Sequence, residues 1–150
     1  MNKLFQMIKK DHQEVKGILG KLKESKQSDH KKREELFHTL KQELVPHMKA
    51  EEAIFYTPLM AKKEAREEAM EGMEEHHVSE LVLKELDKMS KDDDKWIAKV
   101  SVFKELVEHH IQEEESVLFK AAEKALSKDE LDMMAEKVEE EKQKIKKKLK

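Results

Sequence analysis

Apolar residues recur at intervals of three and four along nearly all of the 150-residue chain, and this spacing constrains the fold more than any other feature. A helix with about 3.6 residues per turn places residues spaced in this way on one face. Only three Gly and two Pro interrupt the pattern, and these are the two strongest helix breakers. The sequence therefore predicts long amphipathic helices rather than a sheet.

Five predicted helices are separated by short polar turns. The first covers about residues 3–25, the third follows Ala61, and the fifth opens at Ser127 with a capping-box pattern. We expect Pro46 to bend the second helix and Pro58 to end or kink it. The apolar stripes are Leu4, Ile8, Val15, Leu19 and Leu22; Leu36, Leu40, Leu44 and Ile54; Leu83 and Leu86; Trp96, Val100, Phe103, Val107, Val117, Ala121 and Ala125; and Leu131, Met134, Val138, Ile145 and Leu149.

Short turns between these helices favour antiparallel neighbours. We therefore expect an all-α fold, an up-down-up-down antiparallel four-helix bundle over residues 1–126. An additional short C-terminal amphipathic helix, residues 127–150, should pack on or beside it. Nothing in the sequence marks a linker or a second domain.

The charge balance and the lack of cysteine exclude several classes of protein. The chain has 31 Lys and Arg against 34 Asp and Glu, a formal net charge of −3, so no basic field favours nucleic acid. The absence of Cys excludes disulfides and thiolate metal sites. Without a signal-peptide pattern or a long apolar run, we expect a cytoplasmic protein with no membrane partner. The oligomeric state stays open.

Ionisable residues occupy some positions of the apolar stripes, where the spacing calls for apolar side chains. We call the inward-facing positions of these stripes the seam. His12 fills a gap in the first stripe. His47 and Glu51 interrupt the second stripe, and His110 and Glu114 interrupt the fourth. Burying such groups unpaired costs roughly several kcal/mol each, so they must pair, titrate or bind a ligand.

The chain also repeats itself. His47-x-x-x-Glu51-Glu52 matches His110-x-x-x-Glu114-Glu115 at an offset of 63, and Asp11-His12 matches Glu75-His76 at an offset of 64. The second match favours His76 over His77 as the counterpart of His12, and it places Glu80 one turn further along the same face. The phase of the fourth stripe favours Glu114 over Glu115. The choice between His76 and His77 and the choice between Glu114 and Glu115 both stay open.

The remaining histidines, His30, His38, His77 and His109, fall off the seam and should face solvent. Tyr56 follows Glu51 closely and is a candidate neighbour of the centre, but the sequence assigns it no role.

The four seam histidines can meet at one level of the bundle. His12 and His47 lie about 14 and 18 residues from the turn between their helices, and His76 and His110 each lie about 15 residues from theirs, at ~1.5 Å per residue. These heights differ by no more than about one turn. Imidazole and carboxylate without sulfur suit iron, manganese or zinc. A seam Glu on each of two facing helices is well placed to bridge two metal ions.

The chain resembles the hemerythrin-like, or HHE cation-binding, family over about residues 1–126. The resemblance rests on the pattern H…HxxxE…H…HxxxE, formed here by His12, His47, Glu51, His76, His110 and Glu114. It implies a four-helix bundle that holds two non-haem iron ions with an oxo or hydroxo bridge. The four histidines would be terminal ligands, and Glu51 and Glu114 would bridge the irons.

The sequence departs from the similar oxygen-carrying hemerythrins at two places. Glu80 stands where they have a second histidine, and Glu114 and Glu115 lie four and five residues after His110, where they use Asp at five. An anionic Glu80 ligand would favour ferric iron, so we expect a centre more prone to oxidation than an oxygen carrier.

The resemblance implies a protein that binds or reacts with O2, peroxide or nitric oxide. If the protein is an enzyme, the expected activity is consumption of peroxide, as in a catalase. Whether it is an enzyme stays open. The alternatives are a non-enzymatic iron, oxygen or redox sensor and an O2 or iron storage module.

Overall fold

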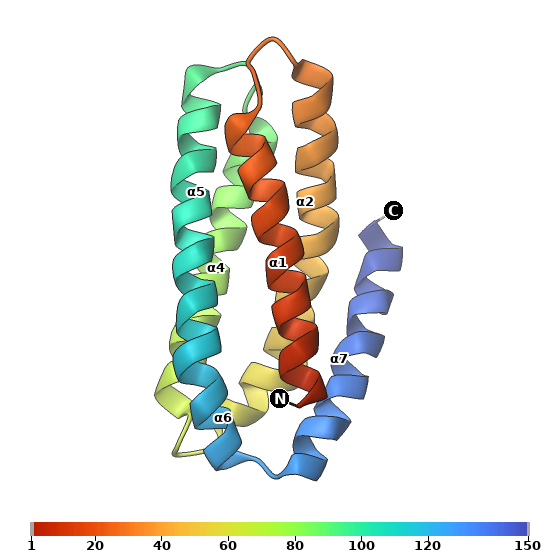
Figure 1. Cartoon of the computed structure of the whole chain (residues 1–150), viewed down its shortest axis with the longest axis vertical. Coiled ribbons are helices and arrows are strands. Elements are labelled where there is room, and N and C mark those ends of the chain that lie inside the picture. The colour runs from red at the N-terminus through yellow and green to blue at the C-terminus, as the bar shows by residue number, and fades with distance from the viewer. Residues whose placement is uncertain (1, 150) are drawn as a thin grey trace.

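The computed structural model describes residues 2–149 as helices joined by short turns, with no strand in that range (Figure 1). The segments are α1 (Lys3–Glu24), α2 (His30–Ala50), η1 (Glu51–Tyr56), α3 (Thr57–Met60), α4 (Arg66–Lys88), α5 (Asp94–Glu113), η2 (Glu114–Leu118), α6 (Phe119–Ala125) and α7 (Lys128–Leu149). The short segments η1 and η2 are π-helical and directly continue α2 and α5. The predicted all-α fold is confirmed.

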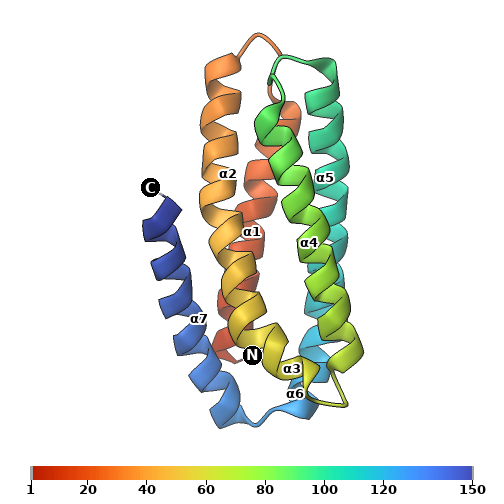
Figure 2. The same ribbon diagram turned by 180° about the vertical axis from the view of Figure 1, so that it is seen from behind.

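The first four long helices form an up-down-up-down bundle (Figures 1 and 2). Helix α1 packs against α2 and α5, and α4 packs against α5. Helix α7 lies outside the bundle, against α1, α2 and η1. It has 22 residues, so it fills nearly all of the predicted range 127–150, and it is as long as α1 rather than shorter.

Polar side chains fix the helix starts. Asn2 caps α1 by accepting a hydrogen bond from the backbone of Phe5 at 2.9 Å. The predicted capping box forms at the start of α7, where the hydroxyl of Ser127 accepts from the backbone of Glu130 at 3.1 Å. The Glu130 carboxylate accepts in return from the backbone of Ser127 at 2.9 Å. These bonds satisfy backbone donors that no helical carbonyl can reach.

The two π-helical turns begin at the carboxylates of the repeated His-x-x-x-Glu motifs. A π turn holds more residues than an α turn, so it rotates every later side chain relative to a continuous α-helix. For this reason the prediction that Val117 lies on the inner face is wrong: it is 43 % exposed, whereas Leu118 is 3 % exposed. The same shift leaves Ile54 only partly buried and Phe55 fully buried.

The prolines do not explain the π turns. Pro46 lies inside α2, which continues through it, and Pro58 lies in α3, two residues before that helix ends at Met60. The turn η2 forms at the equivalent place of the repeat although neither α5 nor η2 contains proline. The π turns therefore belong to the repeated motif itself.

One polar layer divides the apolar core into two clusters. The cluster beside α3, α6 and α7 includes Leu4, Ile8, Phe55, Leu118 and Leu131. The cluster nearer the α1–α2 turn includes Val15, Leu22, Phe37, Trp96 and Val107. The layer between them holds buried histidines from all four bundle helices: His12, His47, His76 and His110.

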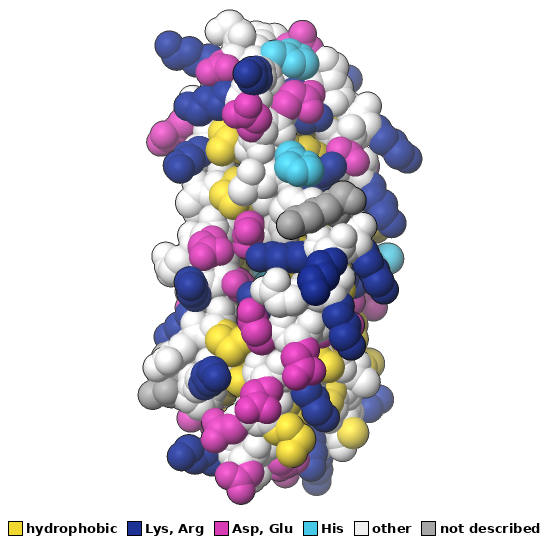
Figure 3. All heavy atoms as spheres, turned by 90° about the vertical axis from the view of Figure 1, so that its right-hand side faces the viewer, with side chains coloured by type: hydrophobic (Ala, Val, Ile, Leu, Met, Phe, Trp, Pro, Cys, Tyr) yellow, Lys and Arg dark blue, Asp and Glu magenta, His cyan; other side chains and the backbone are white. Residues whose placement is uncertain are grey.

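The outer surface is strongly charged. Figure 3 shows Lys, Arg, Asp and Glu side chains intermixed over the face formed by α2 and α7. No helix within residues 2–149 is long and apolar enough to cross a membrane.

The shifted helical phase can be tested with two neighbouring alanine substitutions. Leu118→Ala should lower the free energy of unfolding by about 2–5 kcal/mol because it leaves a cavity in the core. Val117→Ala should change it by about 0.5 kcal/mol or less, because the side chain is exposed. Urea denaturation of the metal-free variants measures both values. A larger loss for Val117→Ala would contradict the π turn at η2.

Candidate metal centre

Six of the seven predicted ligands converge in the polar layer as two groups of donor atoms. The first group consists of His12, His47, Glu51 and Glu114, and the second of Glu51, His76 and His110. Within each group the donor atoms lie within 4.8 Å of one another, and every member is buried. Glu51 belongs to both groups and can therefore bridge two ions.

The histidines turn the same ring nitrogen, Nε2, toward the carboxylates of this layer. Oε1 of Glu51 lies 3.3 Å from Nε2 of His47 and 3.2 Å from Nε2 of His76. Oε1 of Glu114 lies 3.0 Å from Nε2 of His12. In the second group, the Nε2 atoms of His76 and His110 are 3.1 Å apart.

The other ring nitrogen of each histidine, Nδ1, faces a carboxylate outside the donor groups. Asp11 lies 2.9 Å from Nδ1 of His47, and Glu75 lies 2.7 Å from Nδ1 of His110. The second pair of carboxylates acts across the two halves of the repeat: Glu52 lies 2.9 Å from Nδ1 of His76, and Glu115 lies 2.6 Å from Nδ1 of His12. A carboxylate only accepts hydrogen bonds, so Nδ1 carries the hydrogen and Nε2 is free to bind a metal.

The donor atoms fit a bound cation. Nε2 of His12, both oxygens of Glu51 and Oε1 of Glu114 have no hydrogen-bond partner among residues 2–149, although all four atoms are buried. Unsatisfied buried acceptors are costly, and lone pairs that face one another across about 3 Å repel. A metal ion between them would satisfy nitrogen and oxygen donors together.

In the metal-free protein, protons must take the place of that cation. Burial alone lowers the pKa of His47, but the charge of Glu51 and the hydrogen bond to Asp11 outweigh it and raise the pKa to about 10. Burial also disfavours the charged form of His76, but contacts with Glu51 and Glu52 raise its pKa to about 9. The layer is therefore built to hold positive charge, whether protons or metal.

The sequence model of the Hemerythrin HHE cation binding domain matches residues 3–122, from α1 into α6. The chain belongs to this family. Comparisons with curated proteins and with solved structures give no match. Helix α7 lies outside the matched range of this HHE domain.

Glu80 is the predicted ligand that the structure does not bring into the polar layer. Its carboxylate forms an ion pair with Lys49 at the surface between α2 and α4, and it belongs to neither donor group. Glu115 likewise lies outside the donor groups and contacts Nδ1 of His12 instead. His77, the alternative to His76, is exposed.

Tyr56, a candidate neighbour of the centre in the sequence, lies inside it and has contacts that the spacing did not predict. Its hydroxyl donates a hydrogen bond to Oε2 of Glu114 and lies 3.2 Å from Nε2 of His110. Burial and the nearby charge of Glu114 raise the pKa of Tyr56 well above its usual value, so the hydroxyl keeps its proton. Glu114 therefore directs Oε1 to the first group, while its second oxygen is held by Tyr56.

Gly72 gives the Tyr56 ring its room. A Cβ at this position would lie only 3.1 Å from Cε2 of the ring. The repeat contains a signal for both residues, since Tyr56 stands opposite Phe119 (119 − 63) and Gly72 stands opposite Ile8 (72 − 64). The first half thus carries a hydroxyl that the second half lacks, and the second half lacks a side chain that the first half has.

Lys142 of α7 extends the hydrogen-bond network beyond the HHE match. Its ammonium group lies 2.9 Å from both oxygens of Asp11, which in turn contacts His47. Burial tends to raise the pKa of Asp11, but His47 and Lys142 together lower it, so Asp11 stays ionised. Lys142 fills a gap between Val138 and Ile145 in the apolar stripe of α7, which is the signal that could have revealed it.

The carboxylates that face Nδ1 should control metal affinity. Glu115→Gln removes the charge that orients His12, and we expect affinity for a divalent cation to fall by roughly 10–100-fold. Competition with a chromogenic chelator measures the change. Glu105→Gln, an exposed site on α5, is the matched control and should keep wild-type affinity. Equal affinities in all three proteins would refute this role.

The histidine pKa values predict that metal-free protein loses stability as the pH rises and that the stabilisation added by a bound metal grows over the same range. A pKa of about 10 for His47, above the unfolded value of about 6.5, adds stability that is complete below pH 6.5 and is lost as pH rises toward 10. Metal-free protein should therefore lose stability between pH 6.5 and 9. The stabilisation by added Co²⁺ should grow over the same range, because the metal competes with those protons. Denaturation midpoints with Co²⁺ or chelator test both trends, and a metal-free midpoint that rises with pH would contradict them.

Proposed function

We propose that the protein holds two non-haem iron ions in the polar layer and uses them to bind or react with O2, peroxide or nitric oxide. The observation that carries the proposal is the position of Glu51, whose carboxylate belongs to both donor groups. A shared carboxylate is the arrangement that a two-metal site requires. Membership of the HHE cation-binding family supports a metal as the ligand.

The donor set is compatible with iron. Each group combines neutral imidazole with carboxylate and contains no sulfur, a set that suits iron, manganese or zinc. Bound iron would supply redox chemistry and open coordination positions for a small ligand. The protein's own contribution is to fix the imidazoles through Nδ1, to bury the donor atoms and to hold a proton on Tyr56 next to Glu114.

A small cavity beside the histidines supports a small neutral ligand. Its volume is about 10 Å³, roughly what one water molecule needs. All four seam histidines contribute to its wall, and the other lining residues are mostly apolar: Val15, Leu44, Met48, Ser79, Val107 and Ile111. A space of this size favours a ligand of a few atoms over a larger organic substrate.

A non-enzymatic sensor is the second candidate. It is favoured by the four buried donor atoms that have no hydrogen-bond partner, because loading or loss of metal would change the stability of the whole layer. A metal-dependent change in stability could then alter binding to a partner protein. Storage of O2 or iron would use the same centre without turnover.

Metal analysis tests the two-iron centre directly. Protein expressed with iron should contain about two irons per chain and show oxo-bridge charge-transfer absorption. His47→Ala and Glu51→Ala should lose both iron and absorption, because each removes a donor atom of the layer. His109→Ala, at an exposed histidine, is the matched control and should keep both. Wild-type protein that stays iron-free after anaerobic reconstitution would overturn the proposal.

The reaction is decided by a separate measurement on the loaded protein. Repeated consumption of peroxide without loss of iron supports the enzyme version. Absence of turnover, combined with a large stability difference between loaded and metal-free protein, supports the sensor. A stable O2 adduct that survives many cycles without oxidation supports storage instead.

A further inference from the structure

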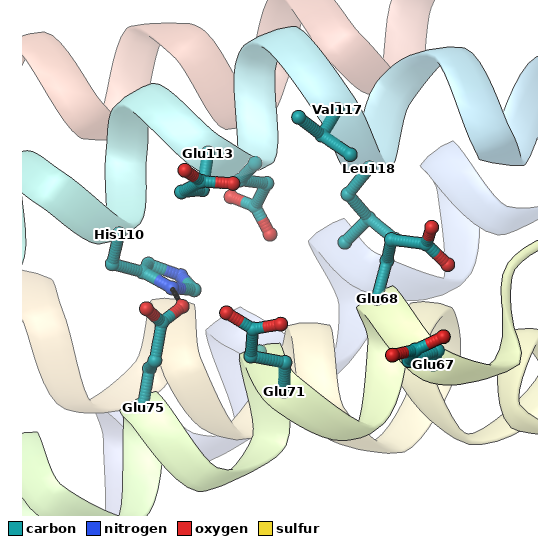
Figure 4. A pocket seen from close by; sticks show the side chains of 10 residues that line it. Glu67, Glu68, Glu71, Glu75, His110, Glu113, Val117 and Leu118 are labelled. Atoms are coloured by element: carbon teal, nitrogen blue, oxygen red, sulfur yellow. Dashed lines mark hydrogen bonds and ion pairs between the residues drawn. The ribbon is translucent and has the colours of Figure 1, made fainter.

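A cavity of about 230 Å³ opens between α4 and the continuous α5–η2 segment, next to the polar layer (Figure 4). Six of its ten lining residues are glutamates, and none is Lys or Arg. Figure 4 shows the carboxylates of Glu71 and Glu75 reaching from α4 toward the helix that carries His110. The six glutamates are Glu67, Glu68, Glu71, Glu75, Glu113 and Glu114.

The acidic side chains of this cavity extend from the surface to the donor atoms. Glu67, Glu71 and Glu113 are exposed, whereas His110 and Glu114 are buried. Within residues 2–149, the three exposed carboxylates have no ion-pair partner, and the half-buried Glu75 contacts His110. The negative charge at the outer end of this path is therefore not neutralised by an ion pair within the described residues.

A buried acceptor at the cavity wall points to a cation. Glu114 lines the cavity, its side chain has no exposed surface, and its Oε1 has no hydrogen-bond partner. His110, also in the wall, belongs to the second donor group. The cavity thus connects solvent to donor atoms on which a metal ion can be bound.

The equivalent face of the first half is closed. Offsets of 64 and 63 map the glutamates and Gly72 of the cavity onto Lys3, Leu4, Met7, Ile8, Asp11, Ala50 and Glu51. Leu4, Ile8 and Ala50 are buried in one cluster with Leu131 and Val138 of α7. Helix α7 therefore covers this face, whereas its counterpart beside Gly72 is open and acidic.

We propose that the acidic cavity is the route by which a divalent cation, supplied as Fe²⁺, reaches the polar layer. The inference rests on the proposed function, since it assumes that the layer binds metal. The cavity has room for several waters at about 30 Å³ each, so a cation keeps part of its hydration until it meets Glu114 and His110. Uncompensated carboxylates attract cations and repel anions, and such fields raise association rates by roughly 10–10³-fold.

The test compares the rates at which metal-free proteins take up metal. The variant E67Q/E71Q/E113Q removes three exposed charges and leaves every predicted ligand and every Nδ1 partner in place. Stopped-flow mixing with Co²⁺, and anaerobically with Fe²⁺, should show uptake slowed by roughly tenfold at low ionic strength. The rate in wild type should fall steeply with added salt, and this dependence should flatten in the variant.

A matched control separates local charge from net charge. D132N/E136Q/E140Q changes the formal charge by the same three units at exposed positions of α7. It should take up metal at the wild-type rate. Equal slowing of the two triple variants would overturn the proposal, because the effect would then be that of the whole protein's charge.

A charge-swap pair at one position sharpens the result. Val117 lines the cavity and is 43 % exposed, so V117K and V117E place opposite charges in the same path without disturbing the core. V117K should slow uptake and V117E should not. V102K, at the exposed Val102 of α5 outside the cavity wall, should leave the rate unchanged. Identical rates for V117K and V117E would overturn the proposal.

Equilibrium measurements keep this inference distinct from the proposed function. All of these variants should reach the wild-type metal content after long incubation, because no donor atom is changed. If wild type binds no metal, the proposed function fails. If wild type binds metal and E67Q/E71Q/E113Q loads at the wild-type rate, the proposed route is wrong but the proposed function stands. The surface cavity near Lys49, Glu74 and Glu80 then becomes the path to examine.

Discussion

The burial of one ionisable layer in the middle of a narrow helical bundle is the constraint on which the rest of the structure depends. Four imidazoles and two carboxylates lie buried between two apolar clusters, where their side chains are largely removed from bulk water. Such a layer is tolerable only if positive charge is shared among its lone pairs. Protons on the histidines supply that charge in the metal-free protein, and a metal would supply it in the loaded protein.

The sequence predicts the helices and the level of this layer well because both follow from spacing. Gaps in the apolar stripes and the repeated His-x-x-x-Glu motif are local features. Because a helix rises by a fixed distance per residue, their positions in the sequence give the height of each ligand in the bundle. The Nδ1 partners are less accessible to this reasoning. Asp11, Glu52, Glu75 and Glu115 are each adjacent to a predicted ligand in sequence, yet each contacts a histidine on another helix.

The features that spacing missed have two causes. A uniform period of 3.6 residues cannot predict the π turns, so it placed Val117 on the inner face instead of Leu118. The same shift brings Tyr56 into the centre, where its hydroxyl contacts Glu114. Glu80 falls on the correct helix, but the available partner Lys49 holds its carboxylate at the surface. The position of such a side chain depends on its neighbours on other helices, and the apolar stripe of a single helix carries no information about them.

The internal repeat is symmetrical at the ligands and unsymmetrical around them. In the first half, α7 covers the helices and Lys142 neutralises Asp11. In the second half, Glu75 occupies the position of Asp11 but borders an open acidic cavity. The two donor groups therefore differ in solvent access and in surrounding charge, although their imidazoles are equivalent in sequence.

The crossing of Glu52 and Glu115 between the halves has a further consequence. Glu52 of the first half orients His76 of the second, and Glu115 of the second half orients His12 of the first. Neither helical hairpin alone can hold all of its own imidazoles in place. A chain of half this length would complete the set only by pairing with a second copy of itself, in the manner of a symmetric dimer. Joining the halves in one chain makes that assembly an intramolecular event, independent of protein concentration.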